Sequence, residues 1–237
     1  MPKIAVTALF VAGCALSLGN AARADQSLFT ASVGTRSASA LFDATGSTLT
    51  VTLTNTSAFD ALMPIDVLTA VFFDVDGAPL SLTRSSAVLG LGSTVLFGAP
   101  DPGGVVGGEW SYADGLSGAP QSAGYGISSS GFGLFGDMAL FPGNNLQGPT
   151  SPDGLQFGIT SAGDLLGTGN AAVTGANALI QNSVVFTLSG LPVGFSTSSI
   201  HNVSFQYGTA LDEPNIPAPG SLALLALGAA AAFRRRR

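Results

Sequence analysis

The sequence contains little charge, few bases, one cysteine and one histidine. Charged residues make up 9% of its 237 positions, and only 8 of them are Lys or Arg. So few cations cannot form the basic surface that a nucleic-acid-binding protein needs. One cysteine excludes an intramolecular disulfide scaffold, and together with one histidine it is too few for the usual zinc ligand sets. A hydrophobic content of 46% excludes an acidic disordered chain, and the length suits one ordinary domain.

The few charges are segregated along the chain. Lys3, Arg23 and Arg234–Arg237 account for six of the eight bases, whereas all 14 acids lie within residues 25–213. The stretch 25–213 therefore carries 14 acids and two bases, a net charge of −12, although the whole chain has −6. This division predicts terminal segments whose role differs from that of the acidic body.

The N-terminal segment has the features of a secretory signal. Lys3 precedes an apolar run from Ile4 to Leu18, and Ala22 and Ala24 form an A-x-A site. We therefore predict a signal peptide over residues 1–24 that directs export by the Sec route and is cleaved by signal peptidase after Ala24. The alternative is an uncleaved membrane helix, but the run is shorter than the ~20 residues of a full span.

A second alternative concerns Cys14. Val11-Ala12-Gly13-Cys14 resembles a bacterial lipobox, in which the cysteine is acylated and the protein becomes a lipoprotein. Only seven residues, Ile4 to Phe10, separate this box from Lys3, and the A-x-A site follows it. Cleavage after the A-x-A site would leave no cysteine in the mature protein, which suits an oxidising exterior.

The C-terminal segment, residues 213–237, combines three features in order. Pro217-Ala218-Pro219-Gly220 is followed by the apolar run Leu222–Phe233 and then by Arg234, Arg235, Arg236 and Arg237. Proline interrupts helices, and the Leu and Ala of the run favour one. Twelve helical residues rise about 18 Å against a hydrocarbon core of about 30 Å, which predicts a short transmembrane helix. The arginines should stay in the cytoplasm, so the body lies outside.

Residues 216–237 resemble the PEP-CTERM sorting signal of bacterial exosortase substrates. That pattern comprises Pro-Glu-Pro, a short transmembrane helix and a terminal Arg cluster. The sequence matches it at Pro217, at Pro219 and in the run and cluster that follow, and departs at Ala218, where the family usually has Glu. The resemblance implies transient anchoring in the inner membrane, removal of the tail by an exosortase, and delivery to the cell surface or matrix of a cell that makes exopolysaccharide.

The body, residues 25–212, has the pattern of β-structure. Residues 47–55 alternate Leu49, Val51 and Leu53 with threonines, which is the period of a half-buried strand, and 37–55 as a whole predicts a hairpin. Further strands are expected over 67–75, 80–84, 93–97, 155–160, 184–189 and 200–207. Short strands separated by Gly, Pro and Asn turns favour an all-β sandwich of jelly-roll or Ig-like type, with long Gly-rich loops and apolar helices at the two ends of the chain.

One long stretch, residues 98–154, is rich in Gly, Pro, Ser and Asn and has isolated aromatic residues. We expect it to pack on the sandwich with its aromatic side chains as anchors, with a short helix near residues 133–140 as an open alternative. Trp110 and Tyr112, beside Glu109, also suggest an alternative, because aromatic rings stack on sugars. This strip would serve a carbohydrate-binding module, and Glu109 a secreted glycosidase that needs a second carboxyl group.

Two other places in the sequence carry residues capable of metal binding or catalysis. Asp74 and Asp76, in an Asp-Val-Asp-Gly turn, place two carboxylates where Ca²⁺ could find hard oxygen ligands, although the remaining ligands of an EF-hand loop are missing. His201 lies in an expected strand, and no G-x-S-x-G nucleophile motif accompanies it. We therefore predict neither catalytic residues, nor a cofactor, nor an assigned metal site.

Together these patterns predict an exported, non-enzymatic surface or matrix protein. Its expected partners are signal peptidase and an exosortase during processing, the inner membrane transiently, and exopolysaccharide afterwards. The expected processing residues are Ala22, Ala24, Pro217, Ala218, Pro219, Gly220 and Arg234–Arg237.

Overall fold

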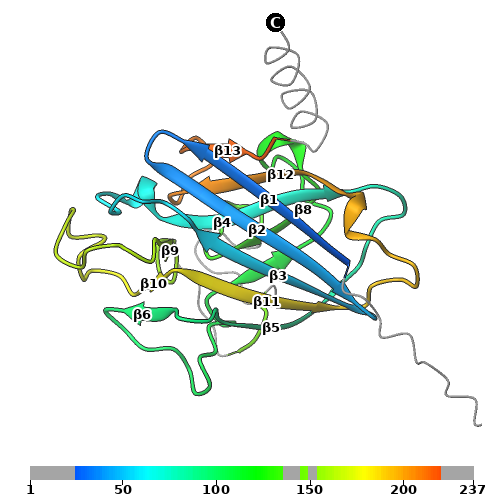
Figure 1. The fold of residues 1–237 in the computed structure, drawn as a ribbon, viewed down its shortest axis with the longest axis horizontal. Coiled ribbons are helices and arrows are strands. Elements are labelled where there is room, and N and C mark those ends of the chain that lie inside the picture. The colour runs from blue at the N-terminus through cyan, green and yellow to red at the C-terminus, as the bar shows by residue number, and fades with distance from the viewer. Residues whose placement is uncertain (1–24, 136–144, 149–153, 220–237) are drawn as a thin grey trace, which may run out of the picture.

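The body is an all-β domain, as the sequence predicts. The computed structural model describes residues 25–135, 145–148 and 154–219. The strands within these ranges form two sheets whose inner faces share one hydrophobic core (Figure 1). The predicted helices at the two chain ends lie outside the described residues.

The first sheet is antiparallel throughout. Its order is β1 (Asp25–Val33), β2 (Arg36–Thr45), β3 (Thr48–Asn55), β11 (Ser183–Ser189) and β5 (Thr83–Leu89). The first three strands are joined by two consecutive hairpins. Strand β11 lies between β3 and β5, although it is distant from both in sequence. The tight connections after Val33 and Thr45 use Gly34 and Gly46, whose φ angles of 61° favour glycine.

The second sheet is built around β4. Its path runs β13 (Asn215–Pro217), β12 (Ile200–Tyr207), β4 (Leu68–Val75), β9 (Ile159–Thr160), β10 (Leu179–Gln181) and β6 (Thr94–Leu96). A branch adds β8 (Tyr125–Ser128) to β4 and β7 (Ser111–Ala113) to β8. Three short 3₁₀ turns are described: η1 (Pro64–Asp66), η2 (Pro120–Ser122) and η3 (Thr197–Ser199).

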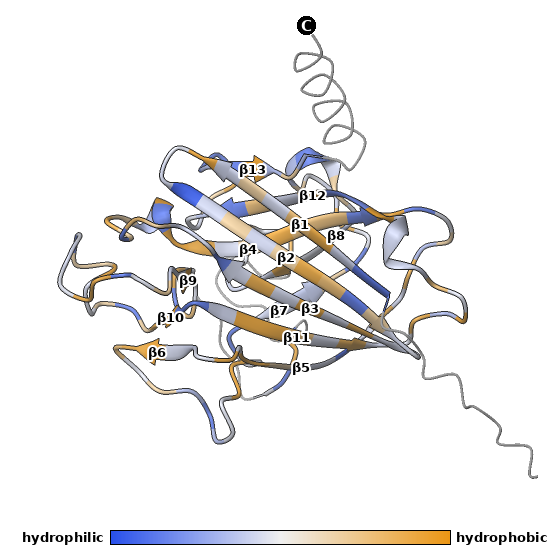
Figure 2. Ribbon diagram, in the orientation of Figure 1, coloured by the Kyte–Doolittle hydropathy of each residue, from blue (hydrophilic) through white to orange (hydrophobic). Residues whose placement is uncertain are grey.

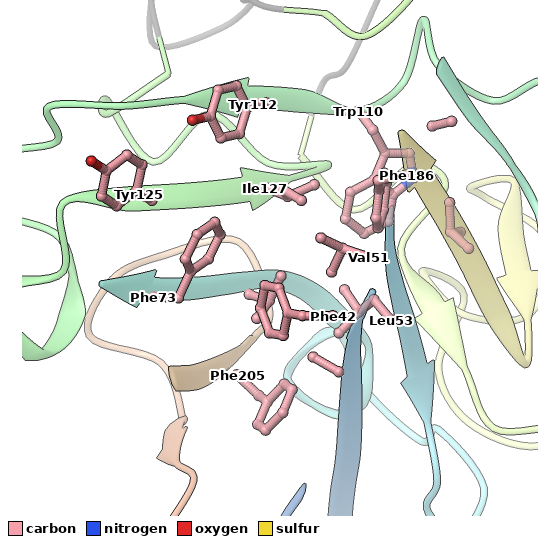
Figure 3. Packing of buried hydrophobic residues seen from close by; sticks show 14 of the residues in the cluster. Phe42, Val51, Leu53, Phe73, Trp110, Tyr112, Tyr125, Ile127, Phe186 and Phe205 are labelled. Atoms are coloured by element: carbon pink, nitrogen blue, oxygen red, sulfur yellow. The ribbon is translucent and has the colours of Figure 1, made fainter. Parts of the chain in front are cut away.

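The shared core follows from the period-two pattern of β3. Leu49, Val51 and Leu53 are fully buried, while the threonines between them are half-buried on the outer face. Facing them are apolar side chains of the second sheet, among them Phe73 and Phe205, as Figure 3 shows. The apolar colouring of β3, β4 and β11 in Figure 2 marks the strands that form this centre.

Strand β4 is covered on both faces. Val71 and Phe73 belong to the shared core, whereas Ala70 and Phe72 belong to a second cluster with Phe135 on the outer side of the sheet. The second cluster is completed by small residues from the segment 113–123. The long Gly-rich stretch therefore acts as a cover for β4, which explains why β4 is apolar along most of its length.

Most strongly patterned strands form where the sequence predicts them. The 37–55 hairpin appears as β2 and β3, the stretch 67–75 as β4, 184–189 as β11 and 200–207 as β12. The weaker stretch 93–97 appears as β6, reduced to three residues.

Other expectations were wrong in detail. The strand expected at 80–84 lies later, as β5, and only Ile159 and Thr160 of 155–160 are extended. The stretch 98–154 contains the paired strands β7 and β8 in addition to loops. Residues 132–134 form a turn, and the rest of the helix considered near 133–140 lies largely outside the described residues.

Strand β1 was not predicted. It begins at Asp25, the residue directly after the predicted signal-peptide site, and pairs with β2 along its whole length without a register shift. The Asp25 carboxylate accepts hydrogen bonds from the Thr197 backbone N–H at 2.9 Å and from its hydroxyl at 3.0 Å. Hydrogen bonds from Ser196 and Thr197 lower the pKa of Asp25. The first residue of the described body is thus fixed to the turn before β12.

Candidate functional site

The proline pair of the C-terminal segment begins inside the second sheet. In the antiparallel pair of β12 and β13, Asn215 lies opposite Gln206, Ile216 opposite Phe205, and Pro217 opposite Ser204. Ile216 is only 4% exposed and is part of the shared core. The sorting segment therefore begins in an edge strand of the folded body, which contains Pro217.

The chain stays attached beyond β13. The backbone N–H of Ala218 donates to the Val203 carbonyl at 2.8 Å, and the Ala218 side chain packs against the core. A groove of about 510 Å³ separates this strand from β1, and Pro217 and Pro219 line one side of it. Figure 1 shows β13 and β1 along the same margin of the two sheets.

The loop between β12 and β13 is held by two side chains. The buried Gln206 amide donates to the carbonyls of Tyr207, Ala210 and Glu213 at 2.9 to 3.2 Å. The Glu213 carboxylate in turn accepts hydrogen bonds from the backbone N–H groups of Thr209 and Ala210. These bonds shape the return of the chain and bring β13 into register with β12.

The boundary between body and sorting segment predicted from the sequence lies at 212/213, and β13 is not among the predicted strands. The available signal was Ile216, a β-branched apolar residue that stands alone between polar residues and prolines. A proline in a strand is acceptable at a sheet edge, so Pro217 did not argue against a strand there. The predicted processing residues Ala22, Ala24, Gly220 and Arg234–Arg237, together with Cys14, lie outside the described residues.

Asp74, considered for Ca²⁺, serves as a hydrogen-bond acceptor between strands. One carboxylate oxygen accepts from the Gly124 backbone N–H at 2.7 Å, and the other accepts from the Asn202 side-chain amide, also at 2.7 Å. Asp74 therefore joins the end of β4 to the start of β8 and to β12. Asp76 lies outside the strand on the surface and does not share these contacts.

His201 lies on the exposed side of β12. Its Nδ1 is 3.2 Å from the Ser199 carbonyl and 3.7 Å from a carboxylate oxygen of Asp76. Both side chains of the His201–Asp76 pair are largely exposed, so the pair contributes little to stability. Within residues 25–135, 145–148 and 154–219, no group of three or more His, Cys, Asp or Glu side chains is placed to hold a metal ion.

The hypothesis that the aromatic strip at 110–112 binds sugar is wrong. Trp110 is fully buried against Phe186 and Tyr112 is 1% exposed, so neither ring can stack on a sugar (Figure 3). They are core residues, in agreement with the expectation that aromatics anchor this stretch. Glu109 is half-buried beside them, and the strip provides no platform for a carbohydrate-binding module.

Both bases of the body are used inside the fold. The Arg36 guanidinium forms an ion pair with Asp66 at 2.7 Å and donates to the Ile65 carbonyl at 2.6 Å, which joins β2 to η1. Arg84 Nε donates to the Tyr112 carbonyl at 2.7 Å and joins β5 to β7. The acidic side chains consequently dominate the charge of the surface.

Fold and site define an all-β body of strongly acidic composition whose last strand leads into a proline-containing terminal segment. The family model of the PEP-CTERM protein-sorting motif matches residues 215–237. The chain therefore carries the PEP-CTERM sorting motif, which implies export to the cell surface or extracellular space and processing by an exosortase. The Ala218 variant does not prevent this match.

The match begins at Asn215, the first residue of β13, so motif and fold overlap over the last described residues. No curated protein and no solved structure matches the chain significantly. None of the helices in the described part of the chain is long and apolar enough to cross a membrane.

Proposed function

We propose that the protein is a structural component of the cell surface or extracellular matrix that associates with exopolysaccharide, and that it is not an enzyme. The observation that carries the proposal is the sorting motif joined directly to a compact body of net charge −12. Three of the residues that the sequence suggested for sugar or Ca²⁺ binding support it, because Trp110, Tyr112 and Asp74 are occupied in packing or in hydrogen bonds within the fold.

The proposed architecture is a β-sandwich of jelly-roll or Ig-like outline. Two sheets that share a core from their inner faces support this assignment, as do the hairpins β1–β2–β3 and the late insertion of β11. The half-buried threonines of β3 make the outer face of the first sheet polar, which suits a protein embedded in hydrated polymer. The proposed contact with acidic polysaccharide uses divalent cations as bridges, because both partners are anionic.

The proposed route to the surface has three steps. The chain enters the Sec pathway through residues 1–24, which signal peptidase removes after Ala24. The apolar run Leu222–Phe233 then holds it in the inner membrane with the arginines in the cytoplasm. Exosortase cleavage near Pro217–Gly220 finally removes the arginine tail and releases the acidic body.

Intact-mass measurement of the protein from exosortase-positive cells tests this route. The expected mass corresponds to a start at Asp25 and a C-terminus that lacks Arg234–Arg237. The control is the double variant Pro217→Ala/Pro219→Ala, which should keep its tail. A full-length C-terminus in the wild-type protein would contradict exosortase processing, and an acylated Cys14 would replace signal-peptidase cleavage by the lipoprotein route.

Co-sedimentation with the exopolysaccharide of the same cells tests the matrix role. The processed body should sediment with the polymer in the presence of Ca²⁺ and remain in solution after chelation. Dextran, an uncharged polymer, is the control and should retain none of the body. Equal recovery on both polymers, or none on either, would contradict the proposed association.

A further inference from the structure

We propose that β13 masks the sorting motif, so that exosortase can process the chain only after β13 separates from β12. This inference rests on the exosortase processing described above and concerns when the motif becomes accessible. We call the pairing of β13 with β12 the gate, because its opening controls whether exosortase can reach the motif.

The fold already uses the backbone and side chains at the start of the motif. β13 presents one backbone edge to β12 in three register pairs, and Ala218 adds its hydrogen bond to Val203. The Ile216 side chain is 4% exposed in the core. An enzyme that binds an extended peptide through its backbone and alternate side chains would find these groups occupied by the body.

Only a short piece of chain separates the docked strand from the apolar run. The described body continues to Pro219, and the apolar run begins at Leu222, with only Gly220 and Ser221 between them. Three residues of extended chain span at most about 11 Å. With the run in the membrane, the docked body therefore stands too close to the bilayer for an enzyme to enclose the proline pair. Release of Asn215–Pro219 adds about 17 Å of chain.

The attachment of β13 to the second sheet is short. β13 is a three-residue strand at the edge of its sheet, and its other backbone edge has no partner strand among the described residues. Short edge elements open locally at a much lower cost than global unfolding. The Gln206 and Glu213 side chains fix the preceding loop and set this cost, so they form the latch of the gate.

A reversible cross-link between the two strands tests the gate. Gln206 and Asn215 lie opposite each other, and the flanking bonds Tyr207 N–H to Pro214 and Ala218 N–H to Val203 make theirs a non-hydrogen-bonded pair, in which side chains are closest. The variant Gln206→Cys/Asn215→Cys would lock β13 when oxidised and free it when reduced.

Cleavage of the full-length variant is measured in membranes that contain exosortase, by intact mass, with and without dithiothreitol. We expect the oxidised form to be cleaved at least about tenfold more slowly than the reduced form, because opening limits access. The matched control is Thr50→Cys/Thr187→Cys, a facing pair of β3 and β11 distant in sequence from the motif, whose cleavage should not depend on its redox state.

A second variant loosens the gate instead of locking it. Glu213→Ala removes the acceptor of two backbone N–H groups in the latch, and we expect about tenfold faster cleavage. Asp212→Ala, at the exposed neighbouring position, should be cleaved at the wild-type rate.

The outcomes separate the gate from the processing on which it rests. Equal cleavage of the oxidised and reduced cysteine pair would overturn the gate, as would a Glu213→Ala rate equal to that of Asp212→Ala. If the wild-type chain itself is not cleaved, the exosortase processing fails instead. Faster cleavage of the oxidised than of the reduced cysteine variant would likewise overturn the gate.

Discussion

The indole of Trp110 packs against the ring of Phe186, with centroids 4.9 Å apart and an interplanar angle of 55°. Trp110 directly precedes β7 of the second sheet, and Phe186 lies in β11 of the first, so this contact connects the two layers across the core. Both side chains are fully buried. The single tryptophan of the chain is thus a structural residue at the centre of the body.

Replacing this tryptophan should therefore affect stability. Trp110→Ala leaves a large cavity, and we expect a loss of about 3–5 kcal/mol in the free energy of unfolding, measured by urea denaturation of the body. Trp110→Phe retains part of the contact with Phe186 and should lose less. A Trp110→Ala variant with unchanged unfolding and impaired polymer binding would contradict this role.

The close packing over β4 predicts an effect at Gly126. A Cβ atom at this position in β8 would lie 2.8 Å from a Phe72 ring carbon and 2.9 Å from one of Phe135. Gly126→Ala should therefore cost about 1–3 kcal/mol of stability, measured by thermal or urea unfolding. Gly163→Ala is the control, because nothing lies within 4 Å of its Cβ, and it should change stability by less than about 0.5 kcal/mol.

The strand contacts of Asp74 predict a stability effect that does not depend on calcium. Asp74→Ala removes the acceptor for the Gly124 backbone N–H and the Asn202 amide, and should cost about 1–3 kcal/mol. Asp76→Ala, at the exposed end of the turn, should change stability by less than about 0.5 kcal/mol. Unfolding is measured with Ca²⁺ and with EDTA. A stabilisation of the wild type by Ca²⁺ that both variants lose would instead establish a metal site at this turn.

Asp164 predicts a pH dependence of stability. Its carboxylate accepts a hydrogen bond from the Ala61 backbone N–H at 2.8 Å, and burial raises its pKa above the ordinary value of 3.8. With a raised pKa in the folded state, the contribution of Asp164 is fully present below pH 3.8 and is lost as the pH rises through the folded-state value. The stability of Asp164→Asn relative to wild type should therefore increase with pH over this window, as measured by urea unfolding.

Asp25 is the control, because its contribution to stability should change with pH in the opposite direction. Hydrogen bonds from Ser196 and Thr197 lower its pKa, so its contribution is present above pH 3.8 and is lost as the pH falls through the lower folded-state value. The stability of Asp25→Asn relative to wild type should thus increase as the solution is acidified. The same trend for both variants would contradict the assignment of these two carboxylates.

The sequence predicts the parts of this fold that depend on side-chain alternation. Leu49, Val51 and Leu53 identify β3 because its outer face is polar, and the continuous apolar run of β4 reflects burial on both faces. By contrast, β1 mixes polar and apolar residues on both faces and is a strand because β2 pairs with it along its whole length. Such pairing depends on the neighbouring strand and leaves little local signal.

The candidate site likewise has one part that the sequence predicts and another that depends on the fold. The sorting motif is predicted because its order of prolines, apolar run and arginines is legible without a structure, and the family model confirms it. That Ile216 is buried opposite Phe205 is a property of the second sheet and could not be predicted from residues 215–219 alone. Similarly, the aromatic residues 110–112 are typical of either a core or a sugar platform, and only the packing decides between them.

The engagement of Arg36 and Arg84 has a consequence for the life of the protein outside the cell. Residues 25–219 contain no lysine, so these two arginines are the only positions in the body after which a trypsin-like protease could cut. Both lie in strands, with their guanidinium groups hydrogen-bonded to backbone carbonyls of neighbouring elements. A protease can therefore cut the peptide bonds that follow Arg36 and Arg84 only when these strands leave the sheet. The folded body is therefore shielded from this class of secreted protease.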